Sequence, residues 1–129
     1  MILGIGVDLC DARRIESSME RFEGRFLDRI YTPAEQQHAR AAAKPALSFA
    51  KRFAAKEAVA KAFGTGVRGF LFVDIEVVSG VLGKPHVLLH GGAVAVLRGL
   101  VPEGRTAHIH LSLSDEDPYA TAYAVIEAY

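Results

Sequence analysis

The chain has 129 residues, half of them hydrophobic, and its 15 basic and 15 acidic side chains give a formal net charge of zero at pH 7. This composition predicts one globular domain with a sizeable core and argues against partners bound by bulk charge, such as nucleic acid or an anionic membrane. The single cysteine, Cys10, excludes an internal disulfide and fits a reducing compartment. With no basic leader and no apolar run of about 18 residues, we expect a cytoplasmic protein.

The first stretch, Ile-Leu-Gly-Ile-Gly-Val-Asp at residues 2–8, predicts a short, mostly buried strand. Gly4 and Gly6 weaken a strand, so they indicate that another backbone approaches closely there. Asp8 ends this stretch. An aspartate in this position more often caps the following helix, and the alternative is that it holds a cation.

Residues 12–30 predict one amphipathic helix with three faces. Its apolar face carries Ile15, Met19, Phe22, Phe26 and Ile30. At 100° per residue, Arg14, Arg21 and Arg25 fall within an arc of about 40°, with the acidic residues on the far side. Helix charges are usually just solvated, but segregation by sign also offers a docking surface to an acidic partner. Both interpretations remain open from the residues alone.

The next two helices are predicted from clear start and stop signals. Thr32-Pro33-Ala34-Glu35 is typical of a helix start with a capping box, and this helix should run to about residue 43. An alanine-rich central helix follows, and it should bury the face that carries Phe49, Phe53, Ala60 and Phe63.

The polar side of the central helix has an unusual composition. Four cations surround a single acid, Glu57; they are Lys51, Arg52, Lys56 and Lys61. The glycine stop Gly64-Thr65-Gly66 then leaves the backbone free to approach a ligand. A lone carboxylate among lysines suits a metal-bridged polyphosphate. A solvated helix with a Glu57–Lys61 pair is the simpler alternative.

The second half of the chain is rich in predicted strands. A hairpin is expected from residues 73–78 and 86–89 around the turn Gly83-Lys84-Pro85, followed by a short helix at 91–101. Residues 108–114 and 119–127 predict two more strands. Helices and strands in separate blocks favour an α+β fold, a single domain over residues 1–129 with an antiparallel-rich sheet packed against the central helix.

Three kinds of chemistry are compatible with the polar residues. Asp8 and Glu57 could hold Mg²⁺ for phosphoryl transfer, with nearby lysines neutralising phosphate charge. Ser48-Phe-Ala-Lys51 matches a serine-nucleophile motif, but its companion motifs are absent and the chain is too short for that class. His108 and His110 share a strand face, yet no cluster completes a zinc site.

Several motifs in order along the whole chain resemble one known family. They are Gly4-Ile-Gly-Val-Asp8, Arg13-Arg14-Ile15, the block from Arg52 to Gly66, Asp74-Ile-Glu-Val77, Gly83-Lys-Pro85 and His110-Leu-Ser-Leu-Ser114. The chain resembles the holo-[acyl-carrier-protein] synthases, the small bacterial 4′-phosphopantetheinyl transferases. The resemblance implies transfer of the 4′-phosphopantetheine arm of coenzyme A to a serine of apo-acyl carrier protein, with release of adenosine 3′,5′-bisphosphate.

The resemblance also implies roles for individual residues. Asp8 and Glu57 match the Mg²⁺ ligands of the family. Arg52, Lys56 and Lys61 match basic positions around the phosphates, Lys61 with a catalytic part. Gly64, Thr65 and Gly66 match the loop beside the nucleotide, and Gly83, Lys84 and Pro85 match a turn that also touches it. Arg14, Arg21 and Arg25 match the helix that docks the acidic carrier protein.

Further expectations concern the base, the assembly and one departure from the family pattern. Glu57 is the candidate base for the serine proton, directly or through a metal-bound water. Family members form homotrimers, so the site is expected to draw on two chains. Many relatives carry His directly after the Ser-x-Ser, where this chain has Asp115, which would repel phosphate unless a nearby cation compensates. A non-catalytic module that binds acyl carrier protein is the alternative function.

Overall fold

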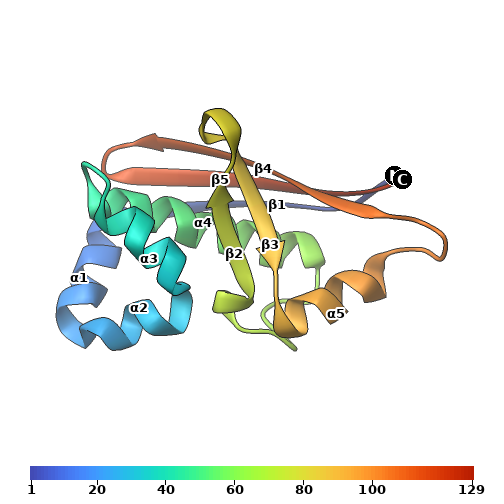
Figure 1. The fold of residues 1–129 in the computed structure, drawn as a ribbon, viewed down its shortest axis with the longest axis horizontal. Helices are drawn as coiled ribbons and strands as arrows, with labels where there is room; N and C mark the ends of the chain where they lie inside the picture. Colours follow the sequence, from blue (N-terminus) through green and yellow to red (C-terminus); the bar gives the residue numbers. More distant parts are fainter.

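In the computed structural model, which describes residues 1–129, a long antiparallel sheet packs on one long helix, with shorter elements grouped around that helix (Figure 1). The elements in chain order are β1 (Ile2–Asp11), α1 (Ala12–Phe22), α2 (Gly24–Ile30), α3 (Pro33–Arg40), α4 (Pro45–Phe63), a 3₁₀ turn (Phe72–Asp74), β2 (Ile75–Ser79), a second 3₁₀ turn (Val81–Gly83), β3 (Pro85–Leu89), α5 (Gly91–Leu100), β4 (Ala107–Glu116) and β5 (Tyr119–Ala128). The predicted α+β class is confirmed.

The three long strands lie in the order β1-β5-β4, and both pairings are antiparallel. β2 and β3 form the predicted hairpin as a separate two-stranded sheet, which crosses α4 in Figure 1. The two chain ends lie side by side because the Met1 amine donates to the Ala128 carbonyl oxygen and the Ala128 amide donates to the Met1 carbonyl oxygen at 2.8 Å.

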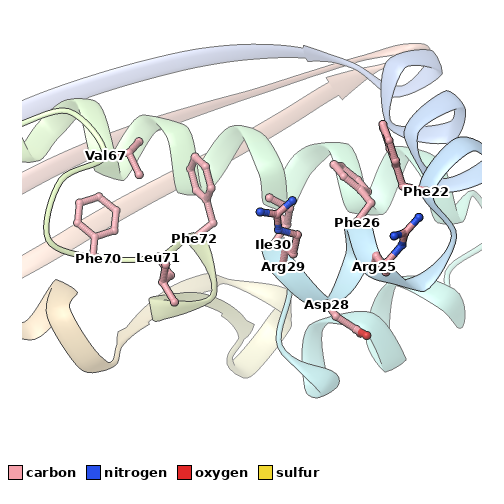
Figure 2. A pocket seen from close by; sticks show the side chains of 10 residues that line it. All are labelled: Phe22, Arg25, Phe26, Asp28, Arg29, Ile30, Val67, Phe70, Leu71 and Phe72. Atoms are coloured by element: carbon pink, nitrogen blue, oxygen red, sulfur yellow. The ribbon is translucent and has the colours of Figure 1, made fainter.

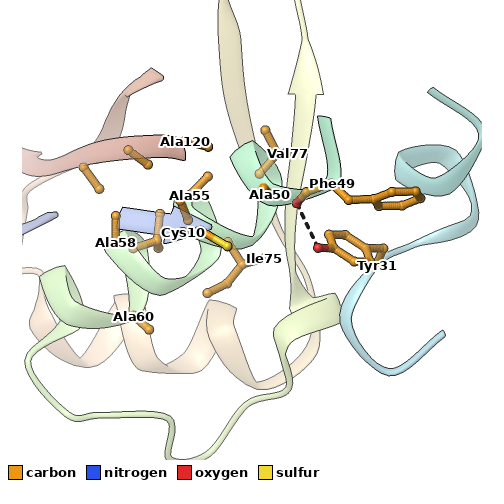
Figure 3. Packing of buried hydrophobic residues seen from close by; sticks show 14 of the residues in the cluster. Cys10, Tyr31, Phe49, Ala50, Ala55, Ala58, Ala60, Ile75, Val77 and Ala120 are labelled. Atoms are coloured by element: carbon orange, nitrogen blue, oxygen red, sulfur yellow. Dashed lines mark hydrogen bonds between the residues drawn. The ribbon is translucent and has the colours of Figure 1, made fainter. Parts of the chain in front are cut away.

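Small side chains dominate the inner face of the sheet along β1 and β5, where α4 packs directly on it (Figure 3). Alanines of β5 alternate inward and are fully or almost fully buried; they are Ala120, Ala122, Ala124 and Ala128. A Cβ on Gly4 would lie 1.9 Å from the Ala62 carbonyl oxygen, and one on Gly6 would lie 1.9 Å from that of Ala58. The close backbone approach predicted from these glycines is therefore confirmed.

The outer face of the same sheet is uncovered, and it is apolar along β1, whereas β4 presents polar residues such as His110. Ile5, Val7 and Leu9 alternate with the buried residues of β1 and point away from α4. Ile5 is 71% exposed and Tyr123, which pairs with Val7, is 60% exposed. A contiguous exposed apolar surface of this kind is typical of an interface.

The predicted helix over residues 12–30 is wrong in one respect, because it breaks at Glu23. Glu23 has φ 53° and ψ −141°, and α2 starts at Gly24. On one straight helix Leu27 would lie about 120° from Ile15, yet the two are 3% and 4% exposed. The break rotates α2 so that both side chains reach the core.

Other boundaries differ by a few residues. α3 ends at Arg40 rather than near residue 43, and Pro45 is already the first residue of α4. The capping box is confirmed: the Glu35 amide donates to Thr32 Oγ1 and the Thr32 amide donates to Glu35 Oε1. No helix is long and apolar enough to cross a membrane.

Candidate active site

Asp8 and Glu57 come together where β1 lies against α4. The pKa of Glu57 is raised above its ordinary value, first by burial and then by the charge of Asp8, while Lys61 opposes the shift. The Lys61 ammonium donates to the Val7 carbonyl oxygen at 2.9 Å and to Asp8 Oδ1 at 3.2 Å. The helix-capping alternative for Asp8 is wrong, since the side chain that caps α1 belongs to Asp11.

The simpler alternative for the central helix, a solvated amphipathic surface with a Glu57–Lys61 pair, is also wrong. Thirteen of the 19 residues of α4 are buried, and the ammonium of Lys61 pairs with Asp8. Packing of the helix on β1 therefore fixes the backbone positions of Glu57 and Lys61 relative to Asp8.

The donor set at this point fits a hard divalent cation. Mg²⁺ is usually held by one or two carboxylates, and substrate phosphates and waters complete its coordination. Two carboxylates, of which Glu57 has a raised pKa, lose their mutual repulsion when a cation lies between them. Burial, and after it the charge of Asp8, raises the pKa of the nearby Cys10 thiol to about 11, so this thiol stays protonated and is a poor ligand at neutral pH.

The loop Gly64-Thr65-Gly66 begins less than one turn beyond Lys61, at the end of α4. Gly64 is the left-handed C-cap, with φ 76°, and Gly66 has φ 68°. Glycine adopts these conformations without steric cost. All three residues are exposed. The Gly64 amide donates to the Lys61 carbonyl oxygen at 3.0 Å, so the amides of Thr65 and Gly66 are the ones open to a ligand that reaches Lys61.

Arg52 and Lys56, predicted to surround the phosphates, are not brought to the carboxylate pair within this chain. Arg52 is 5% exposed, and its Nη1 donates to Ser48 Oγ at 2.8 Å, while its Nε has no hydrogen-bond partner. The Lys56 ammonium is fully buried on another side of α4, where it pairs with Glu35.

Arg52 instead lines a separate cavity of about 510 Å³ together with two residues of the predicted turn, Gly83 and Pro85. Lys84 is exposed and does not line it. Asp115 borders the same cavity, and its Oδ2 lies 3.1 Å from the Lys51 ammonium. The carboxylate that departs from the family pattern thus has a compensating cation.

An apolar groove of about 890 Å³ lies between the α1–α2 region and the segment after α4 (Figure 2). One wall carries Phe22, Phe26 and Ile30, and the other carries Val67, Phe70, Leu71 and Phe72. Arg25 and Arg29 border it. Arg14 and Arg21 are exposed on α1. The break at Glu23 thus divides the predicted basic residues between two helices, and only Arg25 of the three lines this groove.

The two competing motifs do not form their sites. Ser48 Oγ accepts a hydrogen bond from Arg52, and Lys51 pairs with Asp115, so no serine–lysine pair exists. His110 Nε2 lies 2.9 Å from Glu127 Oε1. No group of three or more His, Cys, Asp or Glu side chains is placed to hold a metal ion.

Sequence reasoning missed two features near the site. Glu35 was identified only as a capping residue, whereas its carboxylate is also the buried partner of Lys56, 21 residues away. The apolar segment Phe70-Leu71-Phe72 lies outside every predicted element, and it forms a groove wall. Three consecutive large apolar residues were the signal that could have indicated a buried or binding surface.

Comparisons with known proteins agree with this α+β scaffold. Residues 4–124 match the model of the 4′-phosphopantetheinyl transferase superfamily. Over 129 residues the chain is 55% identical to a holo-[acyl-carrier-protein] synthase of Azorhizobium caulinodans, covering 99% of this chain and 95% of that protein. It is 50% identical to one of Caulobacter vibrioides, covering 99% of this chain and 97% of that protein.

Solved structures give the same result. A holo-[acyl-carrier-protein] synthase of Neisseria meningitidis has a TM-score of 0.86 at 40% identity, covering 98% of this chain and 99% of that one. One of Helicobacter pylori, in complex with coenzyme A, has a TM-score of 0.80 at 27% identity, covering 95% and 99%. The chain therefore belongs to the holo-[acyl-carrier-protein] synthase family of the 4′-phosphopantetheinyl transferases.

Proposed function

We propose that this protein transfers the 4′-phosphopantetheine group of coenzyme A to a serine of apo-acyl carrier protein in the presence of Mg²⁺, and releases adenosine 3′,5′-bisphosphate. The reaction supplies carrier protein for fatty acid biosynthesis. The observation that carries the proposal is the Asp8–Glu57 carboxylate pair beside Lys61. This pair lies in a fold that the chain shares with relatives named holo-[acyl-carrier-protein] synthase.

Asp8 and Glu57 are the residues that would hold Mg²⁺. When bound there, the ion supplies positive charge to the pyrophosphate and to the leaving phosphate. The Lys61 side chain is 54% exposed, so its ammonium can turn from Asp8 toward a phosphate oxygen, which would stabilise charge during transfer. Gly64 ends the helix, and Thr65 and Gly66 would offer backbone amides beside the same phosphates.

The bond changes balance without a further reactant. The serine Oγ forms a bond to the phosphorus that bears pantetheine, and the bond from that phosphorus to the bridging oxygen breaks. The bridging oxygen leaves with adenosine 3′,5′-bisphosphate. Glu57 is the candidate acceptor of the serine proton, and its raised pKa makes it a stronger base than an ordinary carboxylate.

The nucleotide end of coenzyme A would use the second cavity, which Arg52, Gly83 and Pro85 line. Lys84, between the last two in sequence, is exposed and would have to turn toward the nucleotide to contact it. We infer that the complete site combines the carboxylate pair of one chain with this cavity of a neighbour in a homotrimer. Support comes from the uncovered apolar face of the sheet around Ile5 and Tyr123, which a second copy of the chain would bury.

The carrier protein would dock on the exposed arginines of α1 and α2. Arg14, Arg21 and Arg25 are exposed and offer charge complementarity to an acidic protein although the chain has no net charge. Arg25 borders the apolar groove, which would receive an apolar side chain of the docked carrier. This combination of a polar rim and an apolar centre is typical of protein interfaces.

A cytoplasmic location is proposed with this reaction. The thiol of Cys10 is free and buried, which fits a reducing compartment. Nothing in the proposed chemistry requires a membrane or nucleic acid.

The test is intact-mass spectrometry of apo-acyl carrier protein after incubation with this protein, coenzyme A and Mg²⁺. We expect a gain of one phosphopantetheine that EDTA abolishes. If several carrier proteins bind but none gains mass, the protein is a non-catalytic carrier-binding module. If transfer persists in EDTA, the metal role of Asp8 and Glu57 is wrong.

A further inference from the structure

Lys56 is completely enclosed by the protein, with a side chain 0% exposed. Its ammonium donates to Glu35 Oε1 at 2.8 Å and to the carbonyl oxygens of Phe72 at 3.1 Å and Ile75 at 2.5 Å. A lysine ammonium has three N–H donors, so all of them are used inside the protein. Lys56 therefore has no donor left for a ligand phosphate.

The partner carboxylate is held equally firmly. The Glu35 side chain is 1% exposed; its Oε1 also accepts from the Thr32 amide at 2.9 Å, and its Oε2 accepts from the Val77 amide at 2.9 Å. One ion pair thus joins the start of α3, the middle of α4 and the start of β2. Apolar residues often replace a buried ion pair without loss of stability. Stability alone therefore does not account for this pair, and what it adds is a fixed arrangement of the three elements.

The backbone that Lys56 holds carries one wall of the apolar groove. Phe72, whose carbonyl oxygen accepts from Lys56, lines this groove with Phe70 and Leu71 (Figure 2). The Phe72 ring also lies against Phe53 of α4, with ring centroids 5.9 Å apart. Lys56 precedes Glu57 in the same helix, so one rigid element connects the groove wall to the carboxylate pair.

We propose that Lys56, paired with Glu35, is a positioning residue that fixes the Phe70–Phe72 wall of the groove relative to Glu57. By holding this wall, Lys56 sets where a docked carrier protein places its serine. This role differs from the contact with phosphate that the family resemblance implies for Lys56. The expected change in KM rests on the proposed function. The structural link between Lys56 and the groove wall can be measured whether or not the protein transfers phosphopantetheine.

The experiment compares Lys56→Met with the double variant Glu35→Gln/Lys56→Met and with the control Arg40→Met. Methionine keeps an unbranched side chain of similar length and removes the ammonium. The double variant leaves no unpaired buried charge, so it is expected to fold even if the single variant does not. Arg40→Met removes an exposed cation from α3. Hydrogen exchange of the amides of residues 70–76 is measured together with KM for carrier protein and for coenzyme A.

In both Lys56 variants we expect exchange at residues 70–76 to accelerate and KM for carrier protein to rise by about tenfold, with KM for coenzyme A within about twofold of the parent. Arg40→Met should change neither. A rise in KM for coenzyme A alone would mean that Lys56 contacts phosphate, and lower stability with both KM values unchanged would mean a purely structural role; either overturns the proposal. If the parent protein shows no transfer, the proposed function fails, and the exchange data still decide whether Lys56 holds the groove wall.

Discussion

The contact between β1 and α4 leads to a quantitative prediction for Gly6→Ala. A Cβ on Gly6 would lie 1.9 Å from the Ala58 carbonyl oxygen and 2.8 Å from its carbonyl carbon, whereas real Cβ atoms essentially never come within 3.0 Å of another heavy atom. Both groups belong to backbone inside regular elements, so neither can rotate away. β1 must therefore move from α4 by about 1 Å or more, at a cost of about 1–3 kcal/mol in the free energy of unfolding.

The same displacement should reduce activity, because Asp8 lies two residues further along β1 and on the same face of the strand. A misplacement of about 1 Å in a reacting group can lower a rate by roughly 100-fold. Urea unfolding measures the stability change, and the initial rate of phosphopantetheine transfer measures the activity change.

Gly24→Ala is the matched control. A Cβ on Gly24 meets no atom within 4 Å, and alanine is the better helix former at the start of α2, so stability should be unchanged or slightly higher and activity unchanged. If Gly6→Ala unfolds at the same urea concentration as the parent and transfers at the same rate, the packing argument for the carboxylate pair is wrong.

Three further predictions concern charge. Glu57→Gln should lower transfer at least 100-fold while carrier binding persists, and normal turnover would contradict the metal role. Because its pKa is raised, Glu57 makes the metal-free parent less stable as pH rises through that pKa. Thermal unfolding of the metal-free variant should lack this decrease. Asp115→Asn frees the Lys51 ammonium and should lower KM for coenzyme A by about two- to fivefold; a higher KM would show that the carboxylate assists binding. Arg14→Glu with Arg21→Glu should weaken carrier binding and flatten its salt dependence, and an unchanged salt profile would mean that these arginines are only solvated.

Local features of the sequence were sufficient for much of the fold. The Thr32–Glu35 capping box and the Gly64 C-cap follow from hydrogen bonds and backbone conformations within a few residues, so they are visible without tertiary information. Gly4 and Gly6 indicated the close approach of a second backbone. The chemistry of Asp8 and Glu57 suggested a shared metal, but no local feature shows that they meet, since 49 positions separate them along the chain.

Only the tertiary structure distinguished the two lysines of α4. Lys56 and Lys61 have the same chemistry in the same helix, yet one is buried against Glu35 and the other is half-exposed beside Asp8. A helix with apolar residues on nearly every side does not by itself indicate which side faces solvent. The side that faces solvent depends on which elements pack against the others, and those contacts join residues far apart in the chain.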